Sequence, residues 1–360
     1  MKVFYTHSNL ESCYFVRCLL PLMANGWNGD RTSIRGFDIS PESKAKSAME
    51  SEIVVFHRPD DKRSLDIAKM LKKQGKKVVF DNDDTYKDPK VMKLNEYMNE
   101  QRLKRGLKAL NDIIDEFIEL ADLVTCSTEF LKKEYDKLNK NVIVLPNCID
   151  PFYFDEPLRN ETDVVRIGIT GSIGVTADLD IAEPIIKHFQ DRKDVQIVLF
   201  SMPEKGEDSK MRELYYNEYK FLDEAKNLEW HPFTNIERYF DKLNELKLDI
   251  MIIPRADNYF NRCKSNLKFL EASMFEIPVI AQGFEDGMSP YEVNPKDAEH
   301  MVIVKDNSKW IEEVEKLIAD KDKRLEMGKK AHDYVLENYN IEDKSHLWQE
   351  AYETISSNPA

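Results

Sequence analysis

Two lysines and a glutamate lie close together between residues 261 and 281, and their types could bind a phosphorylated ligand. Lys264 precedes a predicted helix that begins at Ser265 or Asn266, and Lys268 and Glu271 share one face of that helix. Free backbone N–H groups, a positive helix dipole and two ammonium groups would favour a phosphate or diphosphate there. The carboxylate of Glu271 could accept hydrogen bonds from paired hydroxyls such as those of a ribose. An ordinary ion pair on a solvated helix face has the same spacing, so both interpretations stay open at this point.

A longer run around this helix resembles a known family. The residues KFLEASMFEIPVIA at 268–281 resemble the donor-nucleotide motif of GT-B glycosyltransferases, especially the retaining family 4 type. The resemblance implies that Glu271 holds the nucleotide ribose and that the helix start faces the donor diphosphate. The family usually has a second glutamate eight residues before the ribose glutamate, where this chain has Cys263. The usual glycine in the turn before the proline is Glu276 in this chain.

Cys263 cannot replace a carboxylate as an acceptor, because a thiol is a weak hydrogen-bonding group. A nucleophilic role is the alternative, since Arg262 and Lys264 would lower the thiol pKa. A nucleotide sugar already carries a good leaving group, however, and the resemblance implies no thiol nucleophile. We therefore expect Cys263 to fill space. The sugar would then be oriented by backbone N–H groups around 262–266 and by nearby Asn or Arg side chains.

A second donor-side segment follows the strand predicted at 164–169. Gly171 and Ser172 would let backbone N–H groups approach a phosphate, although a plain tight turn has the same composition. Members of the family often carry an arginine and a lysine after this loop, and this chain has neither between 171 and 183. We therefore expect the donor diphosphate to be bound by Arg255, Arg262, Lys264 and Lys268. The donor base is expected to lie beside Phe233. The predicted donor-binding residues are Gly171, Ser172, Phe233, Arg255, Asn261, Arg262, Lys264, Ser265, Asn266, Lys268 and Glu271.

Carboxylates gather after the strand predicted at 77–80, where residues 81–84 read Asp-Asn-Asp-Asp. They could cap the next segment, and this pattern is too loose to claim a metal site. In the family a His-Asp pair often follows this strand and approaches the reacting sugar, and Asp83 and Asp84 occupy comparable places. His57 ends the neighbouring predicted strand and would lie near them. We predict Asp83, Asp84, His57 and Lys268 as catalytic residues and expect the reaction to be independent of metal.

Alternating strands and helices must position these side chains. Short apolar runs predict strands at 2–6, 53–56, 77–80, 121–128, 142–145, 164–169, 195–201, around 228, and at 248–254. The segments A-D-x-V-T-x-S-T at 121–128 and V-x-x-L-P-N-x-I-D at 142–150 are similar to the end of the GT-B N-terminal domain. One or two helices are predicted between 89 and 121, with a core-facing stripe of Leu103, Leu107, Leu110, Ile114 and Phe117.

At 360 residues the chain suits two domains of about 150–200 residues each. We predict an α/β fold of two Rossmann-like domains facing a cleft, which is the GT-B arrangement. The N-terminal, acceptor-side domain would span 1–155, with a hinge at 151–163, and the nucleotide-sugar-binding domain would span 163–335. A last helix at about 340–356 is expected to cross back onto the N-terminal domain.

Composition argues against several other classes of protein. No G-x-G-x-x-G run occurs, so a nicotinamide cofactor is not expected. The net charge of −14 disfavours a nucleic-acid partner. No apolar window could span a membrane, the sequence opens directly on a strand without a signal peptide, and the five cysteines follow no disulfide pattern. These features predict a cytoplasmic protein.

The residues and the resemblance predict a glycosyltransferase that moves a sugar from a nucleotide-sugar donor to a hydroxyl acceptor, with retention implied by the family. A UDP- or GDP-sugar is the expected donor, and no tightly bound cofactor is expected. The expected partners are a glycan or lipid-linked acceptor and a peripheral membrane contact. Three alternatives stay open: a non-catalytic nucleotide-sugar-binding protein, a GT-B epimerase or phosphorylase, and a glycosyltransferase acting on a modified nucleobase.

Overall fold

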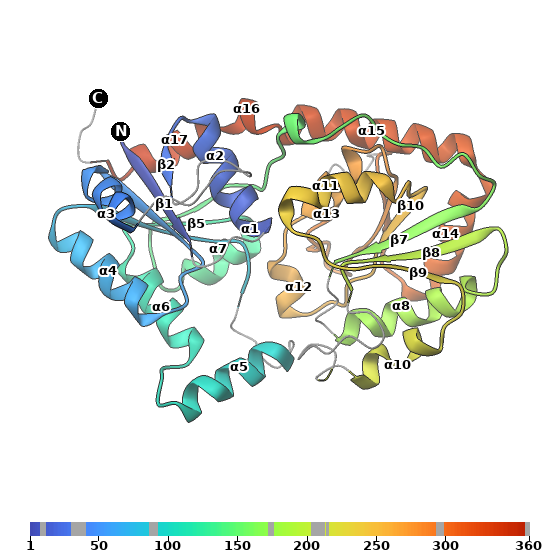
Figure 1. Cartoon of the computed structure of the whole chain (residues 1–360), viewed down its shortest axis with the longest axis horizontal. Helices are drawn as coiled ribbons and strands as arrows, with labels where there is room; N and C mark the ends of the chain where they lie inside the picture. The colour runs from blue at the N-terminus through green and yellow to red at the C-terminus, as the bar shows by residue number, and fades with distance from the viewer. Residues whose placement is uncertain are drawn as a thin grey trace.

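The computed structural model describes residues 1–7, 12–29, 41–85, 93–171, 176–202, 213, 216–292 and 299–356. Within them the chain forms two six-stranded parallel sheets, one in each half of the molecule (Figure 1). The order of the first sheet is β2-β1-β3-β4-β5-β6, and the order of the second is β12-β11-β10-β7-β8-β9. The carboxyl ends of both sheets point toward the boundary between the halves (Figure 1).

The N-terminal half alternates strands and helices as the sequence predicts. Its strands are β1 (Val3–His7), β2 (Asn28–Gly29), β3 (Ile53–His57), β4 (Lys77–Asn82), β5 (Leu123–Cys126) and β6 (Val142–Val144). Its helices are α1 (Ser12–Tyr14), a π-helical turn η1 (Phe15–Leu19), α2 (Leu20–Ala24), α3 (Pro41–Glu50), α4 (Lys62–Lys73), α5 (Lys93–Lys104), α6 (Leu110–Leu120) and α7 (Glu129–Tyr135). The strand order reverses between β1 and β3, where a ligand site is expected.

The C-terminal half begins after a short turn η3 (Pro151–Tyr153). Its strands are β7 (Val165–Thr170), β8 (Val195–Phe200), β9 (Leu228–His231), β10 (Ile250–Ile253), β11 (Val279–Gln282) and β12 (Val302–Val304). Its helices are α8 (Thr176–Phe189), α10 (Tyr216–Glu224), α11 (Ile236–Glu245), α12 (Tyr259–Cys263), α13 (Leu267–Ser273), η4 (Asn307–Lys309), α14 (Trp310–Ala319), α15 (Lys321–Tyr339), α16 (Ile341–Lys344) and α17 (His346–Glu353). Here the strand order reverses between β7 and β10.

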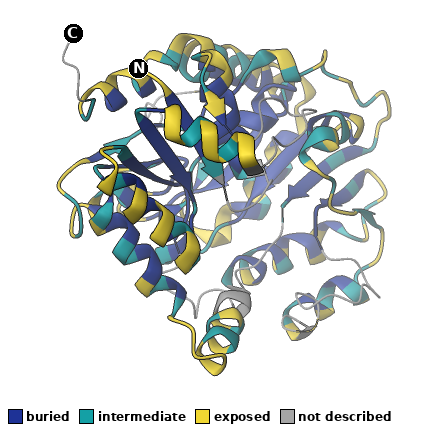
Figure 2. Ribbon diagram, turned by 60° about the vertical axis from the view of Figure 1, so that its left-hand side comes forward, coloured by how far each residue is buried: buried dark blue, intermediate teal, exposed yellow. Residues whose placement is uncertain are grey.

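Central strands such as β3 and β10 are buried along their whole length, because helices cover both faces of each sheet (Figure 2). The predicted stripe between 103 and 117 is wrong at its first two positions. Leu103 and Leu107 are 58% and 51% exposed, whereas Ile114 and Phe117 are buried. The reason is that α5 ends at Lys104 and the chain turns at Gly106, so the stripe does not continue across one helix.

The last helices return to the N-terminal half, as predicted. Backbone hydrogen bonds join Ile149 to Tyr339 and Ile341, at 2.9 and 2.8 Å, and so fasten the end of α15 beside the hinge. Beyond it, the Tyr352 hydroxyl lies 2.7 Å from the Tyr5 hydroxyl of β1. In the described part of the chain, no helix is long and apolar enough to cross a membrane. The domain boundaries near 155 and 163 stay a prediction.

Candidate functional site

In the C-terminal half, a lysine lies against a glycine turn where the strand order reverses. Gly171 follows β7 with a φ of +93°, and its N–H donates to the carbonyl of Phe200 at 2.8 Å. A Cβ atom at Gly171 would lie 2.7 Å from Cε and 2.8 Å from Nζ of Lys268. The left-handed φ favours glycine here, and a side chain would also displace the end of Lys268. The structure therefore places the lysine of α13 against the turn that ends β7.

Three cations influence one another at this point. Burial lowers the pKa of Lys268, Glu271 opposes this, and the positive charges of Arg255 and Lys264 lower it further. Arg255 follows β10, and Lys264 lies between α12 and α13. Among the described residues, Lys268 forms no ion pair with a carboxylate. Arg255 and Lys264 are each paired with a carboxylate, Asp178 at 2.9 Å and Asp84 at 2.6 Å. An anion bound beside Lys268 would offset the positive charge that remains there, so the cluster is suited to a phosphate or diphosphate.

Glu271 is a buried carboxylate one turn deeper in α13, only 6% exposed. The hydroxyl of Tyr239 donates to its Oε2 at 2.9 Å, and the Tyr239 ring stacks on Phe200. Burial raises the pKa of Glu271, while Lys268 and the Tyr239 hydroxyl oppose the rise. Glu271 also reaches a cavity between the two halves that is lined mainly by apolar side chains, among them Phe15, Phe154, Phe240 and Leu267. This cavity is only about as large as one water molecule.

Two predicted donor-binding residues, Arg255 and Asn261, follow β10 and contact the same buried carboxylate. The carboxylate of Asp178 is fully buried and accepts from Arg255 Nη1 at 2.9 Å, from the N–H of Ala256 at 2.8 Å and from Asn261 Nδ2 at 2.7 Å. Arg255 is thus fixed in place with part of its guanidinium engaged. Asn261 is 0% exposed, and its Oδ1 has no hydrogen-bond partner among the described residues. Its contact with a donor stays a prediction.

The other predicted donor-side residues lie in varied surroundings. Arg262 donates to Asp257 and to Asp286, at 2.7 Å in each case, so its guanidinium is already neutralised. The side chain of Phe233 is 74% exposed beyond β9. Asn266 precedes α13 but makes no side-chain cap, and its amide donates to Tyr339 at 3.1 Å. Ser172 lies outside the described residues.

The stretch predicted as a loop and one helix contains two helices, and the first of them docks on the N-terminal half. Asn258 caps α12 by accepting from the N–H of Asn261. The Tyr259 hydroxyl donates to Glu134 of α7 at 3.1 Å, and Ser265 Oγ accepts from Asn147 Nδ2 at 2.8 Å. Polar contacts from this stretch therefore cross between the halves on both sides of Cys263.

Cys263 itself is 0% exposed and belongs to an apolar cluster shared with the N-terminal sheet. Burial raises the pKa of its thiol, and the nearby carboxylates of Asp84 and Glu134 raise it too. A thiol in these surroundings stays protonated at neutral pH, which removes the chemical basis of the nucleophilic alternative. Cys263 fills space, as the sequence analysis expects.

A buried polar network lies at the carboxyl ends of the N-terminal strands. Arg17, from the π-helical turn, is fully buried and donates to both carboxylate oxygens of Asp81, at 3.1 and 2.6 Å. His57 Nδ1 lies 3.0 Å from Asp81 Oδ1, and Thr125 Oγ1 donates to Oδ2 at 2.7 Å. Burial alone would raise the pKa of Asp81, but Arg17 and His57 outweigh it and hold the pKa well below its usual range. His57 Nε2 is buried and lacks a hydrogen-bond partner among the described residues.

Asp83 and Asp84 follow this network at the edge of the boundary between the halves. Arg58 lies 4.0 Å from Asp83 Oδ1 and 3.8 Å from Asp84 Oδ2. Burial alone would raise the pKa of Asp83, but Arg58, His57 and Arg17 outweigh it and lower the pKa. Asp83 is thus held as a carboxylate by the positive charges around it. Within the described residues, no group of three or more His, Cys, Asp or Glu side chains could hold a metal ion.

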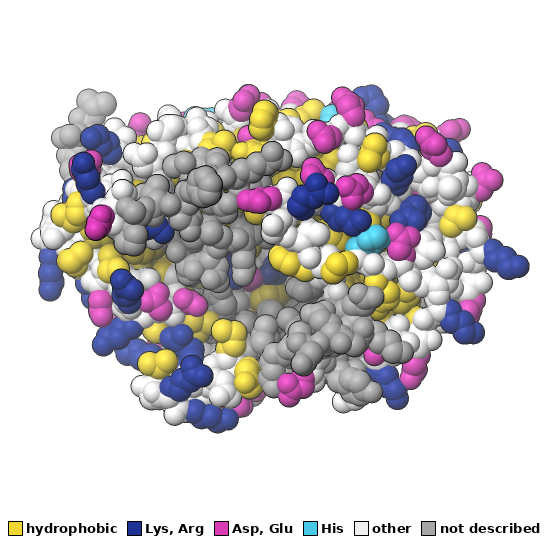
Figure 3. All heavy atoms as spheres, in the orientation of Figure 1, with side chains coloured by type: hydrophobic (Ala, Val, Ile, Leu, Met, Phe, Trp, Pro, Cys, Tyr) yellow, Lys and Arg dark blue, Asp and Glu magenta, His cyan; other side chains and the backbone are white. Residues whose placement is uncertain are grey.

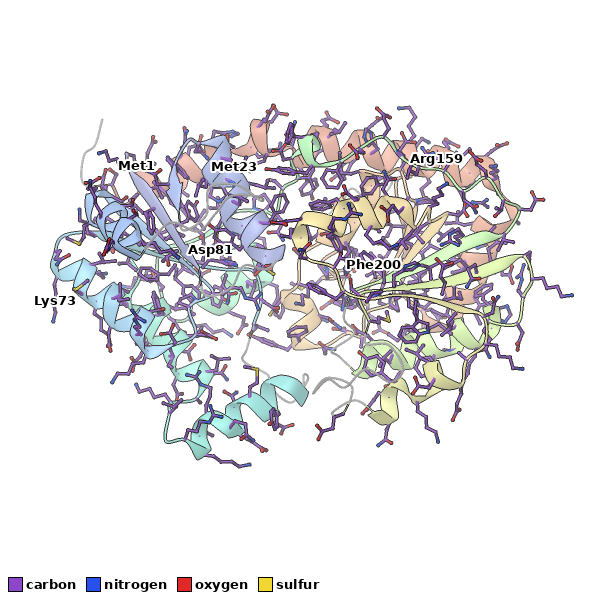
Figure 4. All side chains as sticks on the ribbon, viewed as in Figure 1. Met1, Met23, Lys73, Asp81, Arg159 and Phe200 are labelled. Carbon is purple, nitrogen blue, oxygen red and sulfur yellow. The ribbon has the colours of Figure 1, made fainter. Side chains whose placement is uncertain are left out.

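The polar network around Asp81 and the side chains around Phe200 therefore lie on facing strand ends. Figure 4 labels one on each side, Asp81 at the end of β4 and Phe200 at the end of β8. The surface is hollowed where the halves meet, and charges of both signs are dispersed over the visible face (Figure 3). Sequence reasoning missed Arg17 and Tyr239, which support Asp81 and Glu271. The sequence feature that could have indicated a buried role for Arg17 is its position as a single arginine within an apolar helix.

The whole chain is similar to solved structures. HepE from Anabaena, in complex with UDP and glucose, has a TM-score of 0.66 at 12% identity, covering 99% of this chain and 100% of that one. Sucrose-phosphate synthase from Thermosynechococcus elongatus has a TM-score of 0.64 at 13% identity, covering 99% of each chain. A glycosyltransferase from Rickettsia africae has a TM-score of 0.63 at 14% identity, with the same coverage. Neither a protein-family model nor a curated protein matches the sequence. At these identities the likeness shows the fold alone, and it confirms two Rossmann-like domains facing a cleft, the GT-B arrangement.

Proposed function

We propose that this chain is a glycosyltransferase that uses a nucleotide-sugar donor. The observation that carries the proposal is the convergence of Lys264, Lys268 and Arg255 beside the buried carboxylate of Glu271, at the strand reversal of the C-terminal half. A nucleoside diphosphate needs cations for its phosphates and an acceptor for its ribose hydroxyls, and this site offers both. Further support comes from HepE, which was solved with UDP and with UDP-glucose.

In the proposed mechanism, Lys268 and the backbone turn at Gly171 hold the diphosphate. Negative charge builds on the leaving diphosphate as the glycosidic bond breaks, and a preplaced cation stabilises that charge more in the transition state than in the ground state. Glu271 accepts from the ribose hydroxyls and fixes the nucleotide in register. Asp83 and Asp84 would bind the acceptor hydroxyl from the opposite half, with His57 beside them. Retention of configuration is proposed from the family resemblance.

The donor and acceptor are proposed by class. A UDP- or GDP-sugar is the donor, with its base on the side of Phe233, and a hydroxyl of a glycan or lipid-linked saccharide is the acceptor. Peripheral membrane contact is supported by α4, which exposes Ile67 and Met70 among several lysines. We also propose a reducing, cytoplasmic location, which is supported by five free cysteines.

Acceptor-dependent release of nucleoside diphosphate tests the proposed activity. Transfer requires both substrates, so a nucleotide sugar should yield free nucleoside diphosphate only when a suitable acceptor is added. A non-catalytic binding protein is the second candidate, because Cys263 stands where the family has a glutamate. Tight donor binding without turnover across acceptor pools would favour that candidate. Turnover of the nucleotide sugar to an isomer, without any acceptor, would instead indicate an epimerase.

We expect Asp83→Asn to lower turnover by about tenfold or more while the protein stays folded, because this carboxylate helps to hold the acceptor. The change keeps the shape of the side chain and removes its charge. Activity of the wild type in EDTA should equal activity without it, since we assign no metal to the site. The measurement is the initial rate of nucleoside diphosphate release, with and without EDTA. Complete loss of activity in EDTA, restored by Mg²⁺ or Mn²⁺, would contradict the assignment of Asp83 to the acceptor.

A further inference from the structure

A carboxylate of the N-terminal half is paired with a cation of the proposed donor site. Lys264 Nζ donates to Asp84 Oδ2 at 2.6 Å, and this contact joins residues on opposite sides of the cleft. Both side chains are largely shielded, with relative exposures of 31% for Lys264 and 11% for Asp84. Ion pairs in such partly desolvated places are stronger than exposed ones. The pair therefore holds Lys264 away from any other anion until that anion displaces Asp84.

Other contacts would keep the Asp84 side chain in place if an anion took Lys264 from it. Its Oδ1 atom accepts from the N–H of Thr85 at 2.8 Å, so the carboxylate stays anchored when Oδ2 loses Lys264. Arg58 Nη2 lies 3.8 Å from Oδ2 and still offers positive charge. On the other partner, the Lys264 ammonium lies 4.3 Å from the centre of the Phe260 ring, which helps to hold the lysine head near the cluster around Lys268.

We propose that the donor diphosphate replaces Asp84 as the partner of Lys264 when the donor binds, an inference that rests on the proposed function. The diphosphate takes Lys264, and Oδ2 of Asp84 is released to accept a hydrogen bond from the acceptor hydroxyl. A diphosphate and the Asp84 carboxylate compete for the same ammonium group. The acceptor position is completed only after this exchange, so the donor binds first.

This exchange predicts an unusual sign for one substitution. Asp84→Asn removes the competing charge and should bind UDP or GDP about tenfold more tightly than the wild type does, a change of about 1.4 kcal/mol. Lys264→Met should bind the same nucleotide more weakly. Combining both substitutions should give the affinity of Lys264→Met alone, because Asp84 acts on the nucleotide through Lys264.

Asp83→Asn is the matched control. It removes the same charge from the same loop, but Asp83 lies 4.0 Å from Arg58 and is influenced by Lys264 only through longer-range charge, without an ion pair between them in the described part of the chain. Titration calorimetry with UDP and GDP should therefore show a much smaller gain for Asp83→Asn than for Asp84→Asn. Asp84→Ser serves as a second substitution should Asp84→Asn fail to fold, and it should also strengthen binding.

Several outcomes would overturn the exchange. Unchanged or weaker nucleotide binding in Asp84→Asn and Asp84→Ser would show that Asp84 does not compete for Lys264. Equal gains in Asp83→Asn and Asp84→Asn would show a general charge effect instead of a specific exchange. Should wild type and all variants fail to bind either nucleotide, the proposed function itself would fail, and the exchange with it. Binding that Glu271→Ala abolishes but Asp84→Asn leaves unchanged would overturn the exchange alone.

Discussion

Lys268→Ala is expected to lower kcat by on the order of 10²- to 10³-fold, a loss of roughly 2.7–4 kcal/mol of transition-state stabilisation. The reason is that its ammonium group rests against Gly171, in a half-buried site whose other cations lower its pKa. A cation held there interacts most strongly with a leaving diphosphate as its charge increases. KM for the donor should rise much less than kcat falls, because the ground-state diphosphate carries less of that charge.

The measurement is steady-state turnover of donor and acceptor by wild type and variant. Lys187→Ala is a suitable control, because this lysine belongs to the same half and pairs with Glu183 on the exposed face of α8. It should leave kcat within about twofold of wild type, as is usual for surface substitutions. Unchanged kcat in a folded Lys268→Ala protein would contradict the assignment of the leaving diphosphate to Lys268.

Arg17→Met is expected to destabilise the N-terminal half by about 3–5 kcal/mol, because it leaves the buried Asp81 carboxylate without its principal cation. Both oxygens of Asp81 bind Arg17, and Arg17 also donates to Asn147 at 3.1 Å. Urea denaturation measures the difference. Arg192→Met removes an arginine from a more exposed cluster with Asp194 and Glu315 and should cost no more than about 1 kcal/mol.

The loss of stability caused by Arg17→Met should be larger at neutral pH than at acidic pH. The folded-state pKa of Asp81 is lowered, so ionised Asp81 contributes its full stability above the ordinary aspartate pKa of about 3.9. That contribution is lost as pH falls through the lower folded-state pKa. The difference between wild type and Arg17→Met should therefore be full at pH 7 and shrink below about pH 4. A difference that stays constant down to acid unfolding would contradict the importance of the ionised pair.

Local patterns in the sequence were enough to predict most of the fold. Strands β3 and β10 are short apolar runs, because both faces of a central parallel strand are buried. Lys268 and Glu271 could be recognised because helical spacing places them on one face, whatever the rest of the chain does. The reversal of strand order that brings Gly171 and Arg255 together is a property of the sheet and is not visible in a local pattern.

Side-chain partners from distant segments account for what could not be predicted. Asn261 and Arg262 stand beside the motif, yet Asn261 donates to the buried carboxylate of Asp178 and Arg262 pairs with Asp286. The ion pair between Lys264 and Asp84 joins the two halves and follows only from their packing. Arg17 lies within an apolar run of the sequence, and its partner Asp81 is 64 residues away along the chain. Local spacing predicts candidate groups, but tertiary contacts decide which of them are available.

Stabilisation by nucleotide sugars tests the central claim most directly. Melting temperatures of wild type and Glu271→Ala would be compared in a panel of UDP-, GDP-, ADP- and dTDP-sugars, since a ligand stabilises the folded state by RT ln(1 + [L]/Kd). One donor class should raise the melting temperature of the wild type. Glu271→Ala should weaken that binding by roughly 2–3 kcal/mol through lost charge-assisted hydrogen bonds, and so remove most of the shift. If no nucleotide sugar stabilised the wild type, or if Glu271→Ala were stabilised equally, a donor site at α13 would be contradicted.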